Sequence, residues 1–202
     1  HVLVVVEPFV EEPLRRVLKM NVYNGRRETI TTSPVRNATF LTDNRSQVRF
    51  ANGHDVDAVA QLWYRASDDA KWERFEHLGE GELIQHPVGF SADDRFVYLQ
   101  VERAEGPDVL VEHELASAKR RVVLEDDNVD PAAVLYRANT REPVGVEFHD
   151  GLRRAAFLDG KSPEARLHRS LSAAFAGNVV QITSMSADGG LALVFASSDR
   201  NP

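Results

Sequence analysis

The stretch FSADDRFVYLQV at residues 90–101 decides the fold. A large apolar residue, Phe90, precedes a polar turn at 91–94, and an apolar and aromatic run at 96–99 follows it. Aspartate suits a tight turn because its side chain bonds the nearby backbone and because it tolerates a positive φ. β-Branched and aromatic residues are typical of strands. The stretch therefore predicts a strand, a tight turn and a second strand.

The same pattern recurs along the chain, in stretches beginning at Phe40, Tyr136 and Met185. Aligned on turn residues 43, 93, 139 and 188, the copies lie 50, 46 and 49 residues apart. A second series of strand–turn–strand pieces places a small residue before a basic one at 26, 71 and 119, with steps of 45 and 48. Two turn series with one period indicate a structural repeat.

A period in the high forties with four short strands per unit matches the blade of a β-propeller. We predict an all-β fold, a partial and open β-propeller of about four four-stranded antiparallel blades in one domain, residues 1–202. The first unit lacks its innermost strand, the third is the most complete, and the fifth holds two strands. The blade-like units are 1–33, 38–78, 86–127, 132–176 and 179–202.

One helix interrupts the strands. Ser162 is a suitable N-cap, Pro163 suits the first helical position and Glu164 suits the first turn. Apolar residues then recur at spacing four (167, 171 and 175), and Gly177 suits the C-terminal cap. We expect a short helix insertion around 162–176, where it covers the edge of the fourth blade or, alternatively, meets a neighbouring domain.

Composition excludes several classes of protein. The chain has no cysteine, so it forms no disulfide and holds no thiolate zinc site or cysteine nucleophile. A net charge of −7 argues against nucleic acid as a partner. No apolar run approaches the ~18 residues that cross a bilayer, so no membrane partner is predicted. No signal peptide precedes the first strand-like run, and we expect any targeting signal to lie outside these residues.

No metal or cofactor site is predicted. Asp126, Asn128 and Asp130 resemble the start of a calcium loop, but the glycine and glutamate that complete such a loop are absent. His54 and the nearby aspartates 55 and 57 are too few for a closed metal site. The seven histidines form no His-x-x-x-His pair, and we expect each to be neutral at a strand edge.

Other conspicuous side chains have structural interpretations. Basic stretches at 15–16, 26–27, 119–121 and 153–154 lie at predicted hairpin tips, where we expect them to be solvated. Trp63 and Trp72 flank one hairpin and are expected to pack between blades.

Two turns resemble a known family. Ser-Ala-Asp-Asp at 91–94 and Ser-Ala-Asp-Gly at 186–189 resemble the Ser-Pro-Asp-Gly turn of propellers in the prolyl oligopeptidase family of serine peptidases. The strands at 143–147 and 193–200, with the helix between them, resemble its bacterial dipeptidyl- and acylaminoacyl-peptidase branch. The sequence departs from the pattern where alanine replaces proline in both turns and where Asn139-Thr140 stands in place of Asp-Gly.

The resemblance implies a propeller that caps a separate α/β-hydrolase domain and gates the entry of peptides. In that family the catalytic residues lie in the hydrolase domain, and these 202 residues contain no Gly-x-Ser-x-Gly elbow. We therefore predict a non-catalytic segment of a serine peptidase, with no catalytic, cofactor-binding or metal-binding residue. Its predicted partners are peptide substrates and the C-terminal α/β-hydrolase domain of the same parent chain, in a bacterial cytoplasm or periplasm.

Two alternatives stay open, and one further interaction is expected. The chain could instead be a stand-alone propeller scaffold that binds a protein, peptide or glycan, or a periplasmic translocation-type propeller. An open propeller leaves the apolar faces of its first and last sheets uncovered, so we expect self-association through these faces.

Overall fold

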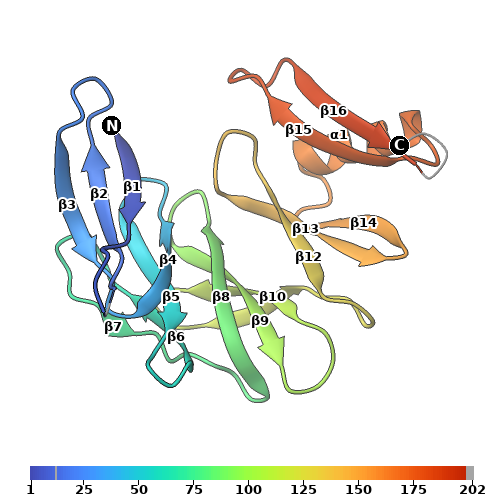
Figure 1. Ribbon diagram of the computed structural model, residues 1–202. Coiled ribbons are helices and arrows are strands. Elements are labelled where there is room, and N and C mark those ends of the chain that lie inside the picture. The colour runs from blue at the N-terminus through green and yellow to red at the C-terminus, as the bar shows by residue number, and fades with distance from the viewer. Residues whose placement is uncertain (12, 199–202) are drawn as a thin grey trace.

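The computed structural model describes residues 1–11 and 13–198, and these residues form five antiparallel sheets and one helix. The sheets follow one another along an arc, with β1–β3 at one end and the hairpin β15–β16 at the other (Figure 1). The predicted all-β class and open propeller arrangement are confirmed. Two of the five sheets have four strands, two have three and one has two.

The element bounds follow the chain, and each sheet is built from consecutive strands. The first sheet holds β1 (Val2–Val6), β2 (Arg16–Met20) and β3 (Arg27–Thr32). The second holds β4 (Arg36–Thr42), β5 (Val48–His54), β6 (Ala60–Tyr64) and β7 (Glu73–Arg74). The third holds β8 (Glu82–Phe90), β9 (Phe96–Arg103), β10 (Val109–Glu114) and β11 (Arg120–Leu124). The fourth and fifth hold β12 (Pro131–Tyr136), β13 (Pro143–Asp150), β14 (Leu152–Phe157), β15 (Val179–Met185) and β16 (Ala192–Ser197).

The two Ser-Ala-Asp turns have the same internal hydrogen bonds. Ser91 Oγ donates to Asp93 Oδ1 at 2.7 Å and accepts from the Phe96 N–H at 3.0 Å. Ser186 Oγ donates to Asp188 Oδ1 at 2.6 Å and accepts from the N–H of residue 191 at 2.9 Å. The serine hydroxyl therefore closes each turn, which explains why this short pattern recurs.

The turn geometry also corrects the predicted repeat alignment. The Ser46 N–H donates to the Asp43 carbonyl, and Ser46 has a φ of 63°. The Asp94 N–H donates to the Ser91 carbonyl, and Asp94 has a φ of 58°. Asp43 is thus equivalent to Ser91, and matching it with residue 93 was wrong by two residues, because an aspartate takes the serine's place in the first copy.

Neighbouring turns bond to one another across the seams between sheets. The Asn44 side-chain amide donates to Asp94 Oδ1 at 2.7 Å and to the Ser91 carbonyl at 2.8 Å, and the Asn44 N–H donates to Asp94 Oδ1 at 3.0 Å. Further along the arc, the Asn139 side-chain amide donates to the Ser186 carbonyl at 3.2 Å. The repeated turns therefore position adjacent sheets as well as reversing the chain.

The main apolar core lies between the second and third sheets. Phe50 is fully buried, and its ring contacts those of Tyr64, Phe75 and Phe90 at centroid distances of 4.9, 5.2 and 5.8 Å. Burial of these aromatic rings stabilises the contact between the two sheets.

Strand β10 lies inside the third sheet and contacts both neighbouring sheets through its side chains. Val109 and Val111 pack in the core shared with the second sheet. Leu110, on the opposite face, packs with Val146 and Phe148 of the fourth sheet. A sheet in the middle of the arc has neighbours on both sides, although Glu112 and Glu114, on the same face of β10 as Leu110, are charged and only partly buried.

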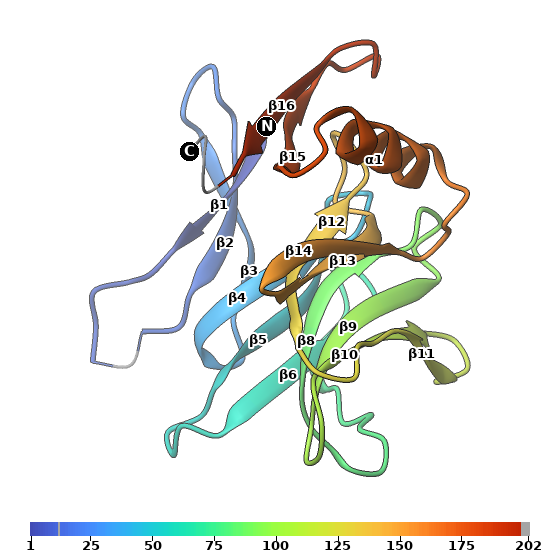
Figure 2. The ribbon, with the colours of Figure 1, turned by 90° about the vertical axis from the view of Figure 1, so that its right-hand side faces the viewer.

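Helix α1 (Pro163–Ala174) follows the fourth sheet and contacts β15 (Figure 2). Ser162 caps it as predicted, since its Oγ accepts from the Ala165 N–H at 3.1 Å. Ala165 is fully buried, whereas Phe175, the last residue of the apolar series at spacing four, is exposed at the C-cap. No helix of the described residues is long and apolar enough to cross a membrane.

Candidate functional site

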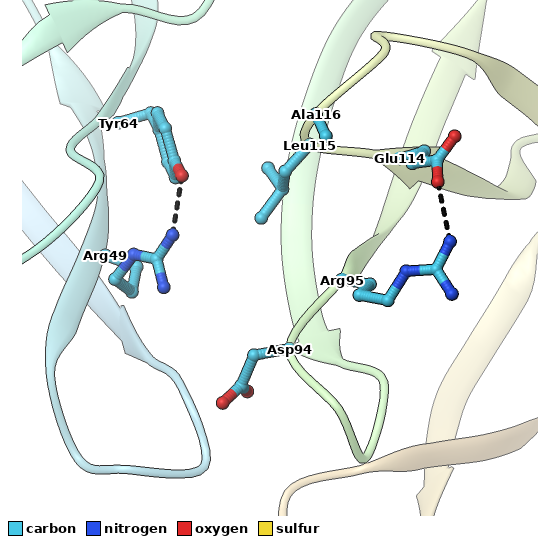
Figure 3. Close-up of a pocket in the computed structure, with 7 residues that line it drawn as sticks. All are labelled: Arg49, Tyr64, Asp94, Arg95, Glu114, Leu115 and Ala116. Atoms are coloured by element: carbon cyan, nitrogen blue, oxygen red, sulfur yellow. Dashed lines mark hydrogen bonds and ion pairs between the residues drawn. The ribbon is translucent and has the colours of Figure 1, made fainter.

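A hollow of about 280 Å³ opens between the second and third sheets, on the side of the arc where their turns lie (Figure 3). Its wall combines charged side chains with the apolar Leu115. The lining residues are Arg49, Tyr64, Asp94, Arg95, Glu114, Leu115 and Ala116. They come from two strands of one sheet and from two turns and the end of β10 in the next, so only the packing of the sheets brings them together.

Arg49, near the start of β5, forms one wall of the hollow. Its guanidinium donates to Asp43 Oδ2 at 3.0 Å, to the Tyr64 hydroxyl at 2.5 Å and to the Arg65 carbonyl at 2.9 Å. The side chains of Arg49 and Asp43 are only 11% and 2% exposed. Burial by itself lowers the pKa of Arg49, but the hydrogen bonds with Asp43 and Tyr64 outweigh it and the pKa is raised. Arg49 is therefore a fixed cation held by a buried carboxylate.

The opposite wall comes from the third sheet. Arg95 is 63% exposed and donates to Glu114 Oε1 at 2.9 Å. Glu114 also accepts from the Ser117 hydroxyl, and this hydrogen bond, followed by the one from Arg95, lowers the pKa of Glu114. Asp94 points into the gap between the two walls (Figure 3). Its Oδ1 accepts from the Asn44 N–H and from the Asn44 side-chain amide, which hold the carboxylate in this direction.

The hollow is suited to recognition by hydrogen bonds. Two guanidinium groups and two carboxylates line it, so its charges balance. A group that both donates and accepts hydrogen bonds, such as a peptide amide, fits this arrangement better than a multiply charged ion. The described lining includes no serine, cysteine or histidine that could form a nucleophile–base pair.

Two of the carboxylates considered as metal ligands have structural partners. Asp55 Oδ1 accepts from the N–H groups of Asp57 and Val59 and closes a tight turn. Asp126 forms an ion pair with Arg154 at 2.7 Å. Within residues 1–11 and 13–198, no group of three or more His, Asp or Glu side chains is arranged to hold a metal ion.

Two expectations about polar side chains were wrong. His113 is 1% exposed near the end of β10, pairs with β9 and β11 on its two sides and contacts the rings of Phe75 and His77, so it does not lie at a strand edge. Arg120, predicted to be solvated at a hairpin tip, donates to Glu82 at 2.6 Å and to Gln85 at 3.0 Å across the third sheet. His113 is covered by Phe75 from the second sheet, and Arg120 is held by side chains of strand β8.

Trp72 packs between two sheets as predicted, whereas Trp63 packs against Ala38 and Ala51 of its own sheet. Trp63 and Trp72 both lie against a small cluster of buried residues that includes Ala38 and Ala51. The Trp72 indole N–H also donates to Thr31 Oγ1 of the first sheet at 3.1 Å. Trp72 therefore links the first and second sheets.

Arg49 is the site residue that sequence reasoning missed. The signal was an arginine inside the strand sequence Val48-Arg49-Phe50, six residues after Asp43. A charged residue between two core positions requires a buried partner or an escape to the surface. The packing of the turn at Asp43 gives Arg49 a buried partner, and the sequence alone does not show this packing.

The fold and this hollow define the class of the molecule as a partial, open propeller of antiparallel sheets. A likeness to a solved structure agrees: TolB from Acinetobacter baumannii matches 96% of this chain and 51% of its own chain, with a TM-score of 0.50 and 12% sequence identity. At that identity the likeness concerns the fold alone.

A characterised relative gives a more particular comparison. Dipeptidyl aminopeptidase BIII of Pseudoxanthomonas mexicana is 26% identical over 120 residues, which cover 59% of this chain and 17% of the relative. This chain therefore matches a small part of a much longer peptidase. No family model matches the sequence.

Proposed function

We propose that this chain is the propeller portion of a serine peptidase of the prolyl oligopeptidase family. The observation that carries the proposal is the 26% identity over 120 residues to a dipeptidyl aminopeptidase. The propeller arrangement and the Ser-Ala-Asp turns support it. The parent enzyme would carry its nucleophile elsewhere, since these 202 residues contain no Gly-x-Ser-x-Gly elbow.

In this proposal the propeller packs on an α/β-hydrolase domain and limits which peptides reach it. The hollow at Arg49 and Asp94 supports a contact with passing peptides, because its balanced charges offer both donors and acceptors to an amide. A site of this kind favours weak, sequence-tolerant contact, as a gate requires.

Peptidase assays of the parent protein test the proposal. The full-length parent, its elbow Ser→Ala variant and the 202-residue chain are assayed with aminoacyl and dipeptidyl chromogenic amides. We expect cleavage by the parent alone. A parent without an elbow or without cleavage would favour the alternative of a propeller scaffold that binds a protein, peptide or glycan.

We also propose that the isolated chain self-associates through the two ends of the arc. Val2 and Val5 are exposed on β1 at one end, and Leu193 and Phe195 are exposed on β16 at the other. Exposed apolar edges and faces of this kind favour association. Light scattering should show a mass that rises with concentration, and a strictly monomeric species at high concentration would contradict this.

A further inference from the structure

The outer edge of β6 carries backbone groups that its own sheet leaves unpaired. In an antiparallel ladder, successive residues direct their N–H and C=O groups alternately to the two neighbouring strands. The Arg65 N–H donates to the Arg49 carbonyl across β5 and β6. By this alternation, Ala60, Leu62 and Tyr64 direct their backbone groups away from β5.

Strand β7 covers only one end of that edge. It pairs with Tyr64 and Trp63, and the Phe75 N–H then donates to the Leu62 carbonyl at 2.9 Å. Phe75 turns into the core and the chain leaves the sheet. Among the described residues, the Leu62 N–H and both backbone groups of Ala60 have no backbone partner.

The third sheet shows the covered form of the same edge. There β11 has five residues and pairs with β10 from Leu110 to His113. The second sheet has two residues in the equivalent strand. The difference leaves room for a further short strand beside β6.

A hollow of about 330 Å³ lies along the uncovered part of β6. Its lining combines apolar and polar side chains. The lining residues are Asn52, Ala60, Gln61, Leu62, Arg74, Phe75, Glu76, Leu78, Leu83, Ile84 and Gln85. Leu78 and Leu83 are 46% and 51% exposed, so the hollow has two large apolar side chains that the fold does not cover.

We propose that this hollow binds an extended peptide, which adds to β6 as a short strand and inserts an apolar side chain between Leu78 and Leu83. The unpaired N–H and C=O groups of β6 determine the class of ligand, because an extended backbone supplies their complement at strand spacing. The charges at the rim do not select for charge in the ligand, since Arg74 pairs with Glu76 at 3.4 Å. The inference goes beyond the proposed function and does not depend on a hydrolase domain.

Amide hydrogen exchange with a defined peptide tests the proposal. The probe is Ac-Lys-Leu-Thr-Val-Thr-Leu-Lys-NH2, and the matched control peptide has proline in place of the central valine. We expect the probe to slow exchange at Ala60 and Leu62, and the proline peptide to bind at least tenfold more weakly, because proline removes a donor and hinders strand pairing.

Two variants and a matched control locate the site. Ala60→Pro removes an outward N–H that the ladder does not use, and Leu83→Asp places a charge at the rim. Both should weaken the probe at least tenfold. Val122→Asp, at an exposed apolar position on β11 of the third sheet, should leave binding unchanged.

Several outcomes would overturn the proposal. These are no detectable binding at millimolar peptide, equal binding of the proline peptide, unchanged binding to Leu83→Asp, and protection at the edges of β1 or β16 in place of β6. Protection of β6 that rises with protein concentration in the absence of peptide would show that a second copy of the chain is the occupant.

Discussion

The second and third sheets have the same strand order and the same turn after the innermost strand, yet they differ at their outer edges. The inner strands share the core around Phe50 and Phe90. The outer strands differ in length, with two residues in β7 and five in β11. Packing between sheets therefore constrains the inner strands, while the outer strand of each sheet can vary without disturbing its neighbours.

The shared core should show the largest effect. Phe50→Ala is expected to lower the free energy of unfolding by about 4 kcal/mol, because it leaves a cavity where four aromatic rings meet. Urea denaturation measures this loss. Phe175→Ala, at an exposed position beside the helix, is the control and should cost well under 1 kcal/mol. Equal losses would mean that the second and third sheets do not share a cooperative core.

The pH dependence of the free energy of unfolding should reveal the burial of His113 in the third sheet. Burial, then the positive charge of Arg120 and the neighbouring His77, lowers the pKa of His113 to about 4. Above the unfolded value near 6.5 the ring is neutral in both states and contributes no pH dependence. As the pH falls from about 6.5 to about 4, the unfolded chain takes up a proton that the folded chain does not, so stability falls by roughly 3 kcal/mol.

His113→Leu should flatten that part of the stability curve. Urea denaturation at a series of pH values between 7 and 4 provides the measurement, and the difference between parent and variant isolates this ring from the carboxylates. His86→Gln, at an exposed position on β8, should retain the parental slope. An unchanged slope in His113→Leu would show that the histidine takes up its proton without unfolding.

The two arginines of the hollow give a matched comparison. Arg49→Met leaves the buried Asp43 carboxylate without its cation and should cost about 2–3 kcal/mol. Arg95→Met removes an exposed ion pair and should cost about 0–1 kcal/mol. Adding Asp43→Asn to Arg49→Met should recover part of the loss in a double-mutant cycle. Similar losses for the two arginines would contradict the difference in burial.

Small effects are also expected at the seams between turns. Asn44→Ala removes the side-chain bonds to Asp94 and Ser91 and should cost about 1 kcal/mol. Asn139→Gly keeps the positive φ, removes one bond to Ser186 and should cost less. Thermal denaturation measures both. A larger loss at Asn139 would show that its turn depends on other contacts of this side chain.

Local signals in the sequence were sufficient to predict the repeated turns, the start of the helix and the all-β class of the fold. The serine and aspartate of each Ser-Ala-Asp turn bond their own backbone, so the pattern works without help from the rest of the chain. Ser162 predicted the helix start for the same reason. These interactions span five residues or fewer, which is why a single sequence shows them.

The candidate site depends on contacts that a single sequence does not show. Arg49 and Arg95 look alike as arginines beside a turn, and only the packing of the turn on Asp43 buries the first. The burial of His113 likewise depends on Phe75, which enters from another sheet. Strand β7 ends early because the next residue, Phe75, packs in the core and does not continue the strand. This contact too lies between sheets and is not visible in a single sequence.

The hydrogen bonds between turns also have a mechanical consequence. Sheets arranged in series behave as a one-dimensional stack, so a rotation at one seam is passed to every sheet beyond it. A rotation at the seam of Asn44 and Asp94 would displace three following sheets, whereas one at Asn139 and Ser186 would displace only the last hairpin. Asn44 makes three hydrogen bonds across its seam and Asn139 makes one. The seam that more sheets follow therefore has more hydrogen bonds between its turns. These bonds limit how far a small rotation at that seam displaces the sheets beyond it.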